Sequence, residues 1–216
     1  PPTAPPLVLQ AQKVSETDAR QIRFLASCRR HLLQQSADTQ IALERLIDFC
    51  VSKARCCRAH EAGIHLLVLD LLKSPDHESD GPLVASCYAV LTACARFYAP
   101  LAADLAASAH TFAMHLGSGV EAAAELLTTI LSASREALLA VPDPAALATY
   151  LIDAHKDGRL RRHTLLILLT ALCGSDAAGT AEDGAGESFW VASHQSAVAS
   201  ILEAHLEDVL LRLVWS

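Results

Sequence analysis

Apolar residues recur along this chain at the spacing of an α-helix. After Asp38 the residues Leu43, Leu46 and Ile47 fall at positions i, i+3 and i+4, and the same face continues one turn later. Runs of β-branched residues are few and aromatic residues make up only 5% of the chain, whereas Ala and Leu dominate. The predicted fold class is therefore all-α. The patterns place helices near residues 15–34, 39–52, 55–60, 62–73, 83–96, 119–133, 144–156, 160–173 and 196–214.

Helix start and stop signals divide the chain. Asp143 and Pro144 form an N-cap and first-turn pair, and Gly158 is placed to end the helix that they begin. The stretch after the last Leu-rich stripe is acidic and rich in Gly and Ser, so it has nothing to bury. The predicted organisation is an extended lead-in over 1–14, helical repeats over 15–173, a flexible acidic loop over 174–188 and a capping helix within 189–216.

The helical stripes repeat with a period near 40 residues. Arg55, Arg96 and Arg135, which are 41 and 39 residues apart, follow the same rhythm as the stripes. A period of this length in an all-helical chain is typical of armadillo and HEAT arrays. The corresponding apolar positions, 45, 39 and 39 residues apart, are Leu46, Leu91, Ile130 and Leu169.

One segment carries a closer resemblance. Residues 60–95, HEAGIHLLVLDLLKSPDHESDGPLVASCYAVLTACA, resemble an armadillo repeat in their E-A-G-I turn, Leu-rich second helix, S-P-D break and third helix rich in Ala and Leu. The units over 96–134 and 135–173 keep the outline of such a repeat. The resemblance implies a right-handed α-solenoid of about three to four repeats, in which the third helix of each repeat lines a concave groove.

The resemblance also implies where a partner binds. With carboxylates on two of the four groove helices, the groove is expected to prefer a partner with a basic segment, while Arg162 would take an acidic end. Armadillo proteins that hold extended peptides clamp them with Asn side chains, and this chain has no Asn, so that mode is not expected. The groove residues that point away from the apolar stripes are Glu44, Asp48, Ser86, Arg96, Glu125, Thr129 and Arg162.

Charge and composition exclude several classes of protein. The net charge of −7 lies entirely in residues 109–216, and the chain has only four Lys, so a nucleic-acid surface is not expected. No apolar run approaches the roughly 18 residues of a membrane span. Six of the seven Cys lie in strongly helical stretches, as reduced buried cysteines do, which favours the cytoplasm or the nucleus.

Candidate chemistry at single sites is weak. Cys56, Cys57 and His60 offer metal-ligand atoms, but adjacent cysteines cannot easily reach one tetrahedral ion and no second ligand pair follows. We therefore predict no metal site and no cofactor. A P-loop, a G-x-S-x-G elbow and a dinucleotide motif are all missing, so the sequence predicts no catalytic residues and no enzyme.

One basic cluster leaves two interpretations open. Residues 159–163 hold three Arg and His163 at the start of a helix, where cations oppose the helix dipole. Pairing with Asp153, Asp157 or the acidic loop would explain them, and so would capture of a phosphate or an acidic peptide.

The function that these patterns favour is a non-enzymatic scaffold that binds another protein through the groove or the ends of a superhelix. The alternative is a regulatory or self-associating domain of a larger protein. A third class is a helical-repeat ligand sensor or enzyme.

Overall fold

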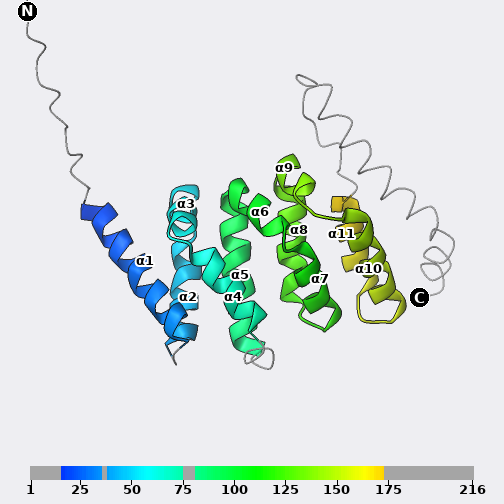
Figure 1. Cartoon of the computed structure of the whole chain (residues 1–216), viewed down its shortest axis with the longest axis horizontal. Coiled ribbons are helices and arrows are strands. Elements are labelled where there is room, and N and C mark those ends of the chain that lie inside the picture. The colour runs from blue at the N-terminus through cyan, green and yellow to red at the C-terminus, as the bar shows by residue number, and fades with distance from the viewer. Residues whose placement is uncertain (1–15, 36–37, 75–80, 173–216) are drawn as a thin grey trace, which may run out of the picture.

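The computed structural model describes residues 16–35, 38–74 and 81–172, and within these ranges the chain is all-α without a strand (Figure 1). The predicted fold class is confirmed at this level. The lead-in over 1–14, the loop over 174–188 and the helix near 196–214 lie outside the described residues. The helices are α1 (Glu16–Gln34), α2 (Thr39–Phe49), α3 (Lys53–Glu61), α4 (Ile64–Lys73), α5 (Gly81–Phe97), α6 (Ala99–Ala106), α7 (Ala109–Gly117), α8 (Ala122–Ala133), α9 (Arg135–Leu139), α10 (Pro144–Lys156) and α11 (Arg162–Leu172).

The helices pack in two connected rows. In one row α2 contacts α5, α5 contacts α8, and α8 contacts α11. In the other row α1 lies against α4 and α7 lies against α10, and each of these four helices also packs on its neighbour in the first row. The short helices α3, α6 and α9 complete the packing, with α3 against α4 and α5, α6 against α5, α8 and α9, and α9 against α8.

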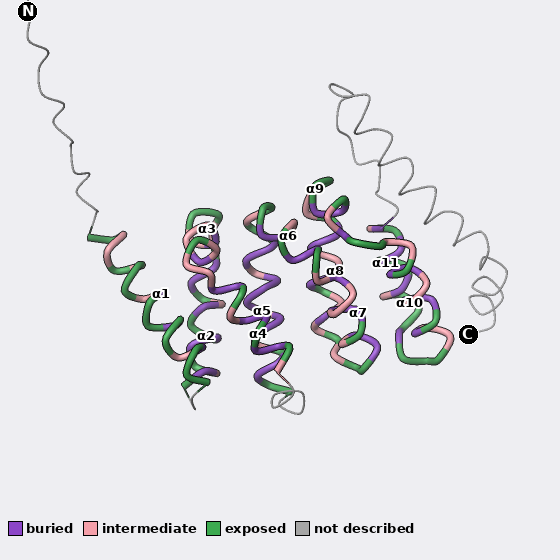
Figure 2. Tube along the Cα trace, viewed as in Figure 1, coloured by how far each residue is buried: buried purple, intermediate pink, exposed green. Residues whose placement is uncertain are grey.

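The core follows the periodic apolar positions. Leu46, Leu91 and Ile130 are completely buried and Leu169 is 5% exposed. These four residues belong to α2, α5, α8 and α11, the four helices that contact each other in series. Buried backbone runs through the interior along this row (Figure 2). The period near 40 therefore identifies core positions that stack from one helix of the row to the next.

Local signals fix two boundaries as expected. Gly63 has φ 69°, a left-handed conformation that favours Gly, and it separates α3 from α4. At the start of α10, the Asp143 carboxylate accepts a hydrogen bond from the Ala146 amide at 2.9 Å, with Pro144 in the first turn. Gly158, with φ 74°, follows the end of α10. The predicted boundaries of this helix are confirmed.

The N-cap of α10 provides a direct test. Replacing Asp143 by Ala removes the acceptor of the Ala146 amide, and the free energy of unfolding should fall by about 1 kcal/mol. Chemical denaturation measures the loss. Asp143→Asn, which keeps a side-chain acceptor, is the matched control and should retain most of the stability. Equal losses in both variants would contradict a capping role.

Three helices were not expected. The patterns assign no helix to α6, α7 or α9, which have only 8, 9 and 5 residues. Smaller differences concern boundaries, since α2 ends at Phe49 rather than near residue 52 and α8 begins at Ala122 rather than near residue 119. The helix expected over 160–173 is observed as Arg162–Leu172.

Candidate functional site

The seven residues expected to line a groove all lie on the row formed by α2, α5, α8 and α11. Their exposure matches the expected orientation away from the core, because five are exposed and Ser86 and Thr129 are partly buried. By helix they are Glu44 and Asp48 on α2, Ser86 and Arg96 on α5, Glu125 and Thr129 on α8, and Arg162 at the first position of α11.

Polar side chains join neighbouring helices of this row. On α2, the Gln40 amide nitrogen donates to the Ser86 hydroxyl on α5 at 2.8 Å and to the Glu44 carboxylate at 2.9 Å. Further along, the Arg96 guanidinium donates to the Glu125 carboxylate on α8 at 2.8 Å. The structure thus brings Glu44 close to Ser86, and Arg96 close to Glu125, so residues of adjacent helices share one polar face.

The pairing of Arg96 with Glu125 changes the expected charge of this face. Both side chains are more than half exposed, so the ion pair contributes little stability, but it offsets the Glu125 charge locally. Glu44 accepts from a neutral amide and keeps its full charge. The acidic part of the face is therefore the α2 end, around Glu44 and Asp48.

A pocket of about 490 Å³ lies where α5, α6 and α8 meet, beside Lys53. Two expected groove residues, Arg96 and Thr129, contribute to it. Sequence reasoning missed the other functional side chains, although Phe97 is 42% exposed, which is unusual for a large apolar residue next to a core stripe. The additional polar and aromatic lining residues are Lys53, Phe97 and Ser132.

The hydroxyls in this pocket are used by their own helix. Thr129 Oγ1 donates to the Glu125 carbonyl at 2.8 Å, and Ser132 Oγ donates to the Thr128 carbonyl at 2.6 Å. A hydroxyl nucleophile would instead need a base within hydrogen-bond reach. The geometry of the pocket therefore suits the binding of a partner side chain rather than nucleophilic catalysis.

The basic cluster at residues 159–163 forms ion pairs. Arg159 contacts Asp157 at 2.6 Å, and Arg161 contacts Glu121, the residue before α8, at 2.8 Å. Pairing with Asp157, one of the two interpretations of this cluster, is thus observed for Arg159. The Arg161 contact adds a further polar link between the ends of α8 and α11.

Three buried thiols meet below α3. The sulfur atoms of Cys50, Cys56 and Cys94 lie within 4.8 Å of one another, and Cys94 Sγ donates to Cys50 Sγ at 3.2 Å. The hydrogen bonds from Cys94 and then from Cys50 lower the pKa of Cys56 to about 7, although burial acts in the opposite direction. Hydrogen bonding to Cys50 and Cys56, together with burial, raises the pKa of Cys94. All six described cysteines are free thiols, as expected.

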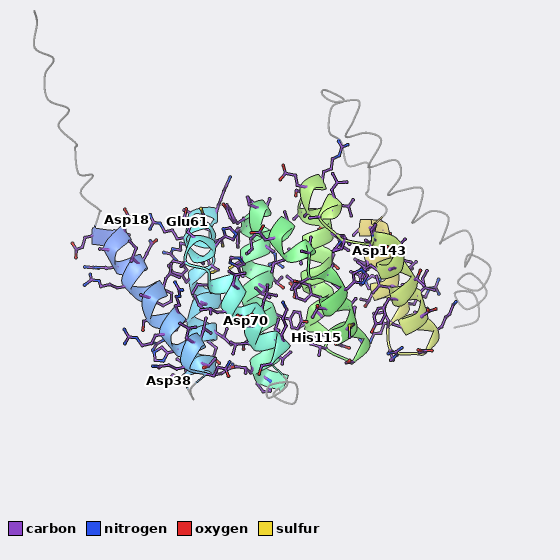
Figure 3. The ribbon with its side chains drawn as sticks, in the orientation of Figure 1. Asp18, Asp38, Glu61, Asp70, His115 and Asp143 are labelled. Carbon is purple, nitrogen blue, oxygen red and sulfur yellow. The ribbon has the colours of Figure 1, made fainter. Side chains whose placement is uncertain are left out.

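A second cluster lies at the other end of α3, where Figure 3 labels Glu61, the residue after His60. His60 Nε2 contacts the Asp104 carboxylate of α6 at 2.6 Å, and the His60 ring stacks on His65 of α4 with ring centroids 4.5 Å apart. The structure therefore divides the expected ligand group, because Cys56 joins the buried thiols and His60 joins this histidine cluster. Its other members, 5 and 44 residues away from His60, could not be found from local spacing.

No family model, no curated protein and no solved structure matches this chain. The function is therefore argued from the geometry of the chain alone. In the described ranges, the search for a helix with the length and apolar character needed to cross a membrane finds none.

Proposed function

We propose that this chain is an armadillo-like helical-repeat module that binds another protein along the face formed by α2, α5, α8 and α11. In this proposal, three units of three helices follow the pair α1–α2: α3–α5, α6–α8 and α9–α11. The observation that supports it best is that four long-spaced helices contact each other in series while their polar sides remain exposed. An extended surface of this kind is what solenoid proteins offer to partners.

The cross-helix contacts support a preformed binding surface. The links from Gln40 to Ser86 and from Arg96 to Glu125 fix side chains of neighbouring helices against each other. A surface whose side chains are already held loses less conformational entropy when a partner binds. The pocket beside Lys53 adds a hollow of a size that one partner side chain can fill.

The charge of the face suggests the chemistry of the partner. Glu44 and Asp48 favour a basic segment at the α2 end, whereas Lys53 and Arg96 in the pocket favour an acidic or aromatic side chain. Arg162 extends the basic character toward α11. We therefore expect a partner whose charged groups change sign along its length.

The charge of the α2 end can be tested with a double variant. Glu44→Lys with Asp48→Lys should slow partner association by about tenfold at low salt and weaken its salt dependence, because exposed charges act mainly through electrostatic steering. The melting temperature should stay nearly the same, since both sites are exposed. The measurement is association kinetics on a partner captured from the native cell with the parent chain.

A matched control changes the same charge elsewhere. Asp70→Lys with Asp153→Lys alters exposed carboxylates on α4 and α10, the other row of helices. This control should bind the partner like the parent. If the face variant also binds like the parent, the α2 end is not the binding surface.

The alternative, self-association, has one specific observation in its favour. Ile22 and Leu33 on α1 are 58% and 60% exposed, which places two large apolar side chains at one end of the array. Sedimentation over a range of concentrations separates the two proposals, because only self-association gives a mass that rises with concentration. A ligand-sensor or enzyme role remains the third proposal.

A further inference from the structure

Three side chains from three different helices converge beside α3. His60 belongs to α3, His65 to α4 and Asp104 to α6, and one potential ligand atom from each lies within 4.8 Å of the other two. The closest contact joins His60 Nε2 to Asp104 Oδ2 at 2.6 Å. Tyr98 lies against the same imidazole, with ring centroids 5.4 Å apart. The cluster thus lies at a junction of separate elements and not along one helix.

The His65 imidazole is the unusual member. The residue is only 9% exposed, and its buried Nδ1 atom has no hydrogen-bond partner. Buried polar atoms are nearly always hydrogen-bonded, because an unsatisfied one loses its interaction with water without compensation. Neither the ring stacking on His60 nor the His60–Asp104 contact satisfies this nitrogen. An additional bonding partner for His65 would remove the deficit.

We propose that His60, His65 and Asp104 bind a divalent transition-metal ion of the zinc type. Two imidazoles and one carboxylate are a ligand set that Zn²⁺ accepts, and imidazole selects transition metals over Mg²⁺ and Ca²⁺. Three protein ligands leave a fourth position for water or for a group of a partner. The ion would join α3, α4 and α6, which hold the ligands from both sides of a repeat boundary.

The protonation state of His65 is suited to this role. Burial, and then the neighbouring His60, lower the pKa of His65, while Asp104 acts in the opposite direction. The ring is therefore neutral at pH 7, and a neutral imidazole is the form that coordinates a metal.

Binding requires a small rearrangement of side chains. The two imidazole rings are nearly parallel, 17° apart, so their lone pairs do not yet point to one centre. With zinc–ligand bonds of about 2.0–2.2 Å, tetrahedral ligand atoms lie roughly 3.4 Å apart, closer than the 4.8 Å limit of this cluster. Rotation of one ring about its Cβ–Cγ bond is inexpensive because that torsion is broad. Asp104 is more than half exposed and can adjust with it.

The test is titration of the reduced, chelator-treated full chain with Zn²⁺ by calorimetry, and with Co²⁺ by visible absorption. We expect one Zn²⁺ per chain, a higher melting temperature with Zn²⁺ and visible Co²⁺ bands. Asp104→Asn and His60→Gln should each weaken binding by more than the 10- to 100-fold that loss of an outer-shell partner typically costs. Both positions are at least partly exposed, so circular dichroism should show unchanged helix content.

Two controls decide between the possible ligands. His110→Gln removes an imidazole that contacts only the Asp143 carbonyl among the described groups, and it should leave Zn²⁺ affinity unchanged. Binding at the cluster of Cys50, Cys56 and Cys94 would instead give intense sulfur-to-cobalt absorption in the near ultraviolet. Such absorption, or equal affinity in the parent and Asp104→Asn, would overturn the proposal. Absence of micromolar binding in the parent would overturn it as well.

Discussion

Replacing Leu91 by Asp should abolish the cooperative unfolding transition of this chain. Leu91 is completely buried on α5, the helix that packs against both α2 and α8, so the new carboxylate would have no water and no partner. Burying an unpaired polar or charged group costs several kcal/mol, which is comparable to the whole stability of a typical domain of about 5–15 kcal/mol. Circular dichroism during heating measures the effect.

A substitution on the same helix provides the control. Ala85→Asp introduces the same side chain at an exposed position of α5 and should change the free energy of unfolding by no more than about 1 kcal/mol. If the two variants melt alike, the apolar stripe of α5 does not face the core and the proposed repeat organisation fails with it.

The long helices were predictable because one physical requirement sets both the sequence pattern and the structure. A helix that packs on one side needs apolar residues every three or four positions, and α1, α5 and α10 follow this pattern within one or two residues of their expected bounds. Asp143 and Gly158 sharpened the ends of α10 because caps impose their own chemistry.

The helices α6 and α7 escaped prediction because Ala does not distinguish the two sides of a helix. Ala102, Ala106 and Ala109 are completely buried, whereas Ala107 is exposed. In such a segment the contrast between apolar and polar positions almost vanishes. Helix α9 has five residues, too few for a periodic pattern to appear.

The sites escaped prediction for a different reason. His60 and Asp104 are 44 residues apart, as are Cys50 and Cys94, while Gln40 and Ser86 are 46 apart. These separations are close to one period of the array, so residues about 40 positions apart are natural candidates for contact. The period does not give the register to one residue, because that depends on helix ends and short helices that the pattern left unassigned.

Replacing Phe112 by Ala tests the segment that the sequence did not predict. Phe112 is completely buried on α7, and its ring contacts the edge of the Tyr88 ring of α5 with centroids 5.9 Å apart. The truncation leaves a cavity beside Tyr88, and the free energy of unfolding should fall by about 3–5 kcal/mol. Urea denaturation with linear extrapolation measures this loss.

A neighbouring residue of α7 shows whether the effect arises from burial. Met114 is 59% exposed on the same helix, and Met114→Ala should change stability by no more than about 0.5 kcal/mol, because little apolar surface is removed from contact. Phe112→Leu, which fills most of the volume, should recover part of the loss. A Phe112→Ala variant as stable as Met114→Ala would mean that α7 does not pack its Phe112 side against α5, and the two-row arrangement would then be wrong at this helix.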